Sequence, residues 1–204
     1  MSDTRKGLVQ AALNKSAALT ENVNNFHKQH EIRQQIILAD NSLTNDEKAY
    51  AIRELNKIYD RNKVYTNEGT KRICENCSQE CLATLYCELC VRNYLKANFP
   101  NWTSGNDDID NLIRECQVET LEPEKVIEWI PYDKLQNIKY LTEGGCSKIY
   151  TAVWIDGGYI EWDSKERQLK RSKKYNVALK RLENVENANQ SWLEEVCDQK
   201  YFSF

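Results

Sequence analysis

Four cysteines form two Cys-x-x-Cys pairs, Cys74 with Cys77 and Cys87 with Cys90, and nine residues separate the pairs. Each pair can fold as a tight turn that directs two sulfurs at one point, and the gap is long enough for the chain to reverse direction. Four thiolates arranged in this way bind Zn²⁺ tetrahedrally at about 2.3 Å. The spacing therefore predicts a zinc site. Because four protein ligands leave no position for water, we expect a structural zinc that supplies folding free energy.

Other cysteine and histidine residues leave alternatives open. Cys81 lies between the two pairs, where it could replace one ligand or be a small buried residue, which is the commoner role of a cysteine. His27 and His30 could share a helix face and bind a metal, but no acidic or cysteine partner lies near them in the sequence. A redox role for a Cys-x-x-Cys pair would need a βαβ unit, which the surrounding sequence does not indicate.

A second group of residues that could bind a ligand lies in "LTEGGCSKIYTA" (residues 141–152) and "VALK" (residues 177–180). The β-branched and aromatic residues predict two strands joined by a glycine turn, followed by a third strand that carries a lysine. Glycines let backbone N–H groups approach phosphates, and a lysine ammonium group can contact them. This order of elements resembles the N-lobe of a protein kinase.

The kinase resemblance implies a weak or vestigial ATP site. It would contain Leu141, Gly144, Gly145, Ile149, Ala178, Lys180 and Glu195, with Glu194 as the alternative to Glu195. In that site Ile149 would cover the adenine, Lys180 would contact the phosphates and the helix glutamate would hold the lysine. The sequence departs from the kinase pattern at Thr142 and Ser147, which stand where the first and third glycines should be. Residues 159–176 look like an insertion between the second and third strands.

Longer segments are similar to an expanded family of protein kinase-like proteins in mycorrhizal fungi. They include "QHEIRQQIILADNSLTNDEK", "KRICENCSQECLATLYCELCVRNYL", "NFPNWTSGNDDID" and "EWIPYDKLQNIKYLTEGGCSKIYTAVW". The similarity covers about residues 25–196. In that family a helical and Cys-pair region precedes a complete kinase domain, so the resemblance implies that the zinc module is an accessory to the kinase.

The given sequence contains neither a His-Arg-Asp nor an Asp-Phe-Gly motif, and 24 residues follow Lys180. Those motifs orient the substrate hydroxyl and bind Mg²⁺. We therefore expect a truncated, pseudokinase-like N-lobe with a signalling role and no phosphoryl transfer of its own. The alternative is a non-catalytic adaptor, in which the helices and the zinc cluster recruit a protein partner such as a kinase relative.

The helices and strands predicted around the cysteine pairs and around the kinase-like segment indicate an α+β protein. Residues 5–39 are predicted to form one long helix, because steps of three and four separate Leu19, Val23, Phe26, His30 and Ile37, with one position skipped at Arg33. Thr44 and Glu47 form a capping box that opens a second helix ending near Arg61. The predicted organisation is a helical hairpin (1–65), a Cys-rich zinc module (66–100), a helical linker (101–125) and the kinase-like N-lobe (126–204).

The linker helix begins in an acidic run. Asp107, Asp108 and Asp110 resemble a metal loop, but their spacing is not that of a calcium site. Acidic residues are favoured in the first turn of a helix, and Ser104 or Asn106 could be its N-cap. We therefore expect the run to cap a helix.

Charge and hydropathy narrow the choice of partners. The net charge is −3, and the Cys-rich segment carries three glutamates and no Lys or Arg, which disfavours nucleic acid. No apolar run approaches the roughly 18 residues of a membrane span, and the N-terminus lacks a secretory apolar region. We expect an intracellular, cytoplasmic protein, where reduced thiols favour metal over disulfides.

Overall fold

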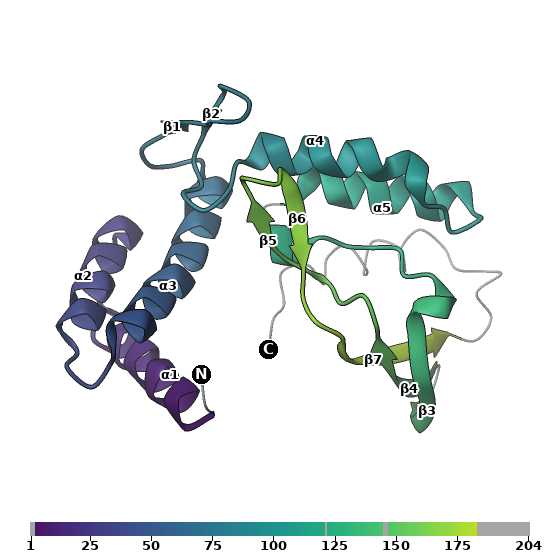
Figure 1. Ribbon diagram of the computed structural model, residues 1–204, viewed down its shortest axis with the longest axis horizontal. Helices are drawn as coiled ribbons and strands as arrows, with labels where there is room; N and C mark the ends of the chain where they lie inside the picture. The colour runs from purple at the N-terminus through teal and green to yellow at the C-terminus, as the bar shows by residue number, and fades with distance from the viewer. Residues whose placement is uncertain (1–2, 121, 145–146, 183–204) are drawn as a thin grey trace. The chain divides into compact units, whose positions relative to one another are not determined.

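The computed structural model describes residues 3–120, 122–144 and 147–182. Its contacts divide the chain into two compact units, residues 1–88 and 89–204, which are described separately below (Figure 1). Helices and small antiparallel sheets make up the described residues, so the α+β prediction is confirmed. No helix among these residues is long and apolar enough to cross a membrane.

The first unit begins with three helices, α1 (Asp3–Ala18), α2 (Phe26–Ala39) and α3 (Asn45–Thr66). The predictions of one helix over residues 5–39 and of a helical hairpin over 1–65 are therefore wrong. The Thr20 hydroxyl donates to the Ser16 carbonyl at 2.9 Å, and the Asn25 side chain caps α2 by accepting from the Lys28 N–H at 2.9 Å. Short polar side chains thus satisfy the backbone groups that a continuous helix would have used.

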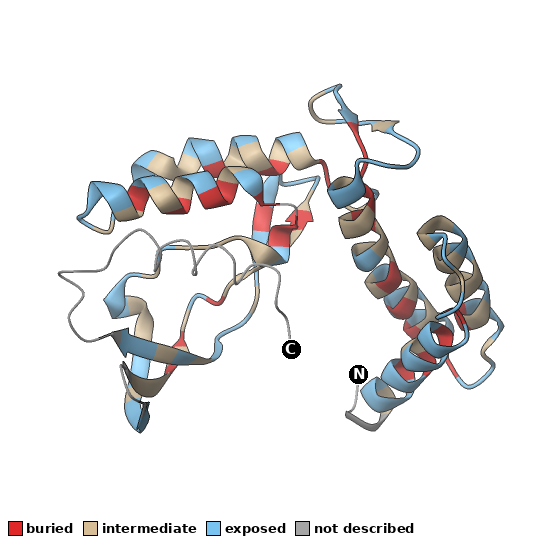
Figure 2. Ribbon diagram, turned by 180° about the vertical axis from the view of Figure 1, so that it is seen from behind, coloured by how far each residue is buried: buried red, intermediate tan, exposed pale blue. Residues whose placement is uncertain are grey.

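Six buried side chains form the core of this unit, and α1, α2 and α3 all contribute to it. They are Val9, Ala12, Ile37, Leu43, Ala51 and Leu55. Figure 2 marks such buried positions in red along the three helices. Leu19, part of the periodic pattern read from the sequence, is 63 % exposed because it lies in the break after α1. The break therefore changes which apolar residues reach the core.

The capping box at the start of α3 is confirmed. The Thr44 side chain accepts from the Glu47 N–H, and the Glu47 carboxylate accepts from the Thr44 N–H at 2.8 Å. The same carboxylate pairs with the Arg5 guanidinium from α1, with one bond of 2.5 Å. The Arg5 hydrogen bond, followed by that from Thr44, lowers the pKa of Glu47 to about 2. Glu47 therefore ties the first helix to the third.

This link predicts a pH-dependent contribution to stability. A carboxyl whose pKa falls from 4.5 to about 2 on folding stabilises the folded state above pH 4.5, and that stabilisation is lost as the pH falls toward 2. Glu47→Gln should be less stable than the wild type at neutral pH and should match it near pH 2. Urea unfolding midpoints of both proteins, followed by circular dichroism across this range, test the prediction. A gap between the two midpoints that stays constant with pH would contradict it.

The second unit contains most of helix α4 (Glu88–Asn98), which starts at the end of the first unit, and helix α5 (Asp107–Glu119). Short 3-10 helices cover Phe99–Asn101, Pro123–Lys125 and Tyr132–Lys134. The Asn106 side chain caps α5 by accepting from the N–H groups of Asp108 and Ile109. The prediction that this acidic run caps a helix is confirmed, with Asn106 as the N-cap.

A three-stranded antiparallel sheet follows, with strand order β3-β4-β7. It contains β3 (Leu135–Gly144), β4 (Ser147–Trp154) and β7 (Tyr175–Leu182). Strands β5 (Tyr159–Asp163) and β6 (Gln168–Arg171) form a separate antiparallel hairpin between β4 and β7. The three predicted strands are confirmed, and the insertion predicted between the last two of them, which the sequence left open as a hairpin or a loop, contains this hairpin. The helix that the kinase resemblance implies around Glu194 and Glu195 lies outside the described residues.

Candidate metal centre

The first cysteine pair lies in the turn of a small hairpin. Strand β1 (Arg72–Ile73) pairs antiparallel with β2 (Glu80–Cys81). Between them the Cys74 N–H donates to the Gln79 carbonyl, and the Ser78 N–H donates to the Cys74 carbonyl, both at 2.9 Å. Ser78 adopts a positive φ of 56°, which turns the chain back toward β2. This tight turn presents Cys74 and Cys77 to the same point.

The second pair lies at the start of α4. Cys87 immediately precedes the helix and Cys90 lies in its first turn, so one helical turn carries both thiols. The second Cys-x-x-Cys pair is therefore formed by a different local structure from the first.

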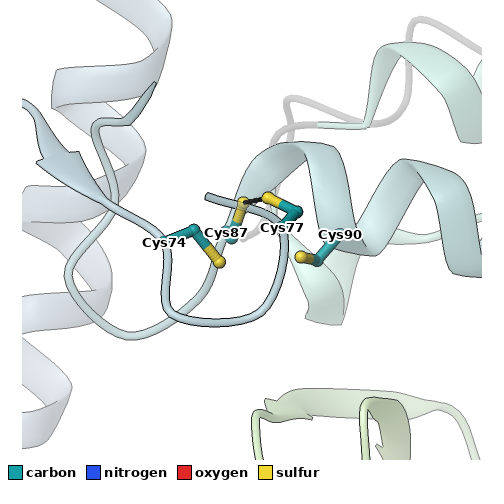
Figure 3. Close-up of side chains that lie close together, drawn as sticks. All are labelled: Cys74, Cys77, Cys87 and Cys90. Atoms are coloured by element: carbon teal, nitrogen blue, oxygen red, sulfur yellow. Dashed lines mark hydrogen bonds between the residues drawn. The ribbon is translucent and has the colours of Figure 1, made fainter. Parts of the chain in front are cut away.

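The four sulfurs converge (Figure 3). All four Sγ atoms lie within 4.8 Å of one another, and Cys77 Sγ lies 3.6 Å from Cys87 Sγ. A zinc ion with four bonds of about 2.3 Å holds its sulfurs about 3.8 Å apart, whereas a disulfide joins them at about 2.05 Å. The separation thus fits a shared metal rather than a Cys77–Cys87 disulfide. The predicted grouping is confirmed: these four cysteines are placed to hold a metal ion.

The surroundings of Cys74 favour the thiolate form of its side chain. Burial raises the pKa of the thiol, but hydrogen bonds from the backbone N–H groups of Cys77 and Asn76 and from the thiols of Cys87 and Cys77 lower it to about 7. The Asn76 N–H lies 3.4 Å from Cys74 Sγ. A substantial fraction of this thiol is therefore deprotonated at neutral pH, and the thiolate is the species that binds metal.

The fifth cysteine of the cluster differs from the other four. Cys81 is buried, and burial raises the pKa of its thiol, which keeps it protonated. Ligand atoms of Cys81, Cys87 and Glu88 also lie within 4.8 Å of one another. The Glu88 carboxylate, however, accepts from the N–H groups of Leu82 and Ala83 at 2.9 and 2.8 Å. This environment favours the interpretation of Cys81 as a buried thiol.

A buried ion pair on α3 holds the loop between the two cysteine pairs. Lys63 Nζ lies 3.0 Å from the Asp60 carboxylate and donates to the Leu82 carbonyl at 2.6 Å and to the Thr84 hydroxyl at 3.0 Å. The other Asp60 oxygen accepts from the Leu85 N–H at 2.8 Å. Asp60 and Lys63 are 0 % and 4 % exposed. Sequence analysis missed both, because a lysine three residues after an aspartate on a helix normally indicates a surface pair.

Arg72 fixes the same loop from the hairpin. Its Nε donates to the Ala83 carbonyl at 2.7 Å, and a terminal nitrogen donates to the Tyr86 carbonyl at 2.6 Å. Tyr86 immediately precedes the ligand Cys87, and Ala83 is fully buried. Groups that do not touch a metal often determine how well its ligands are oriented. Arg72, together with Asp60 and Lys63, therefore positions the second cysteine pair.

Five of the residues that the kinase resemblance assigns to a nucleotide site lie on the three-stranded sheet. Ile149 is the cross-strand partner of Lys180, and Ala178 pairs with Thr151. Leu141 lies at a register shift between Tyr140 and Thr142 and is 60 % exposed. Gly144 ends β3, opposite Ser147. Gly145, Glu194 and Glu195 lie outside the described residues.

The two histidines lie on α2, near Tyr59 of α3. His27 Nδ1 is 2.8 Å from the Tyr59 hydroxyl, and the His30 ring stacks on the Tyr59 ring with centroids 4.0 Å apart. Neither histidine belongs to a potential metal-binding group within the described part of the chain. Both side chains therefore pack α2 against α3.

No protein family, curated protein or solved structure matches this chain.

Proposed function

We propose that Cys74, Cys77, Cys87 and Cys90 bind one structural zinc ion. The observation that carries this proposal is the convergence of four sulfurs within 4.8 Å of one another from two different local structures. Hard cations such as Mg²⁺ and Ca²⁺ prefer oxygen ligands, whereas four thiolates at tetrahedral separations suit zinc. Bound zinc would join the turn of the β1–β2 hairpin to the first turn of α4. It would thereby fix a segment whose own strands are only two residues long.

Metal analysis of the purified full chain tests this proposal. We expect one zinc per chain by elemental analysis. Replacement by Co²⁺ should give the thiolate charge-transfer and visible ligand-field absorption of a tetrahedral site. Cys81→Ser is the matched control, because it changes a cysteine in the same segment that lies outside the four-ligand group and should leave one zinc bound. Absence of metal from wild-type protein prepared with zinc present would overturn the proposal.

As a second candidate, we propose that β3, β4 and β7 form the nucleotide-facing sheet of a protein kinase-like N-lobe. Paired residues of antiparallel strands lie on the same face of a sheet, so Ile149, Thr151, Ala178 and Lys180 share one face. Ala178 and Lys180 are exposed, whereas Val177 and Leu179 on the opposite face are half-buried. An apolar patch beside an exposed lysine suits a base and its phosphates, which supports this candidate.

Nucleotide titration of Lys180→Ala tests this second candidate. We expect weak, saturable ATP binding by the wild type and a loss of about three- to tenfold in affinity in the variant, because the charged group that contacts phosphate is removed. Arg181→Ala is the matched control, since it removes an equal charge from the adjacent residue on the opposite face and should leave binding unchanged. Equal losses in both variants would indicate a nonspecific charge effect. Absence of saturable binding by the wild type would remove the candidate and leave the adaptor alternative.

A further inference from the structure

A cavity of about 600 Å³ lies in the second unit, and neither the four clustered cysteines nor the residues of the three-stranded sheet line it. Its apolar walls come from the 3-10 helix that follows α4 and from the segment that precedes Tyr132–Lys134. They consist of Phe99, Pro100, Trp102, Trp129 and Pro131. The volume is within the range of about 300–1,000 Å³ that is typical of ligand sites. Aromatic and proline side chains together therefore shape a cavity large enough for several residues of a peptide.

Hydrogen-bond donors without acceptors face this cavity or lie in its walls. Arg114 Nε is buried and has no hydrogen-bond partner. The indole N–H groups of Trp102 and Trp129 donate no hydrogen bond to any residue that the structure describes. The Trp102 side chain is half-buried and the Trp129 side chain is exposed, so both indole N–H groups are available to hydrogen-bond acceptors of a ligand in the cavity.

Arg114 is held in place by its neighbours. Its guanidinium carbon lies 5.9 Å from the Phe99 ring centroid and 5.4 Å from that of Trp102. One terminal nitrogen lies 3.7 Å from the Asp110 carboxylate, and the other donates to Asn111 at 3.3 Å. A cation already lies over two of the aromatic rings, so a second cation such as a methylated ammonium group is disfavoured there. The apolar walls therefore suit a neutral ligand.

The cavity also has one carboxylate available for a basic group. Asp107, in the first turn of α5, lines the cavity, is exposed and forms no ion pair within the described ranges. Asp110 differs, because it accepts from the Ser104 N–H and hydroxyl at 2.7 and 2.6 Å and pairs with Arg114. A ligand with an uncharged, apolar body and one basic residue at its end would therefore match both the walls and the rim.

We propose that this cavity, lined by Phe99, Trp102, Asp107, Arg114 and Trp129, binds a proline-rich peptide segment in the polyproline II conformation, with a flanking Arg or Lys on Asp107. A polyproline II helix makes no internal hydrogen bonds, so its carbonyls are free to accept from the indole N–H groups of Trp102 and Trp129. Its proline rings pack on aromatic and proline walls at a low cost in entropy. A turn of about 9 Å fits a cavity of this size. The binding site is separate from the zinc and nucleotide proposals and rests on neither.

Fluorescence anisotropy with the zinc-loaded full chain tests this proposal. The probe is a labelled peptide of about ten residues, mostly proline with one terminal arginine, and its partner probe has the prolines replaced by alanine. We expect saturable binding of the proline-rich probe and at least about tenfold weaker binding of the alanine probe. Trp129→Ala should weaken binding about tenfold, and Tyr132→Ala is the matched control. Tyr132 is an exposed aromatic residue of the same segment that does not line the cavity.

Two milder variants keep the test informative if Trp129→Ala perturbs folding. Trp102→Phe retains an aromatic wall but removes one donor and should weaken binding about threefold. Asp107→Asn should weaken binding of the arginine-containing probe and reduce its salt dependence, while leaving an arginine-free proline probe unaffected. Equal affinity for the proline and alanine probes would overturn the proposal, as would preferential binding of a trimethyllysine peptide without proline.

Discussion

Replacing Cys87 with Ser should abolish stoichiometric zinc binding and unfold the segment from β1 to the start of α4. A serine hydroxyl remains protonated at neutral pH and does not replace a thiolate ligand. Zinc affinity should fall by at least about 100-fold, because one of four ligands is lost from a binding free energy of about 10–16 kcal/mol. Zinc titration against a competing chelator measures the loss.

Hydrogen exchange locates the structural consequence of that variant. In the wild type the Cys74 and Ser78 N–H groups are bonded within the turn, and the Leu82 and Ala83 N–H groups are bonded to Glu88. These amides should lose protection in Cys87→Ser and in chelator-treated wild type, while the core of α1–α3 keeps its protection. Cys81→Ser should change neither zinc content nor exchange in the turn. One zinc retained with normal affinity by Cys87→Ser would refute the four-ligand assignment.

The second large effect is expected from Asp60→Ala. The substitution removes the partner of a lysine that is 4 % exposed, and it leaves the Leu85 N–H without its acceptor. Breaking one side of a buried ion pair costs about 3–5 kcal/mol, and we expect about 3 kcal/mol here because Lys63 keeps two other acceptors. Urea unfolding monitored by circular dichroism measures the change in the free energy of unfolding.

The same substitution should also weaken zinc binding. Asp60 holds Leu85, which lies two residues before the ligand Cys87. Loss of a group that orients metal ligands typically lowers affinity by 10- to 100-fold, and we expect about tenfold. Competition titration with a chelator measures this loss, which distinguishes a role in positioning the site from a general loss of stability.

The same helix provides a matched control for Asp60. Glu54 and Lys57 form another pair three residues apart, at 3.1 Å, but their side chains are 30 % and 26 % exposed. Glu54→Ala should lower the free energy of unfolding by less than about 0.5 kcal/mol and leave zinc affinity unchanged, because water already screens that pair. If Asp60→Ala behaves like Glu54→Ala, the buried pair does not hold the metal loop.

Short-range features were predictable from the sequence because neighbouring residues decide them. The Cys74–Cys77 pair lies in the tight turn that its spacing predicts, and the Thr44 and Glu47 side chains cap α3 through groups three residues apart. The alternation on β7 follows from the period of a strand, which places Ala178 and Lys180 on one face. Even the break between α1 and α2 was present in the sequence as a polar run, but helical periodicity on both sides of it concealed the boundary.

Only the tertiary structure decided which distant groups meet. Asp60 and Lys63 look like a surface pair on a helix, and they are buried because the loop at residues 82–86 folds over them. The cavity brings Trp102 and Arg114 together with Trp129, residues that no spacing rule connects. Such pairings depend on how whole helices and strands pack, and the sum of many weak long-range contacts determines that packing. The sequence by itself therefore determined which four cysteines are candidate metal ligands, whereas packing decided how these cysteines are supported and which side chains line the cavity.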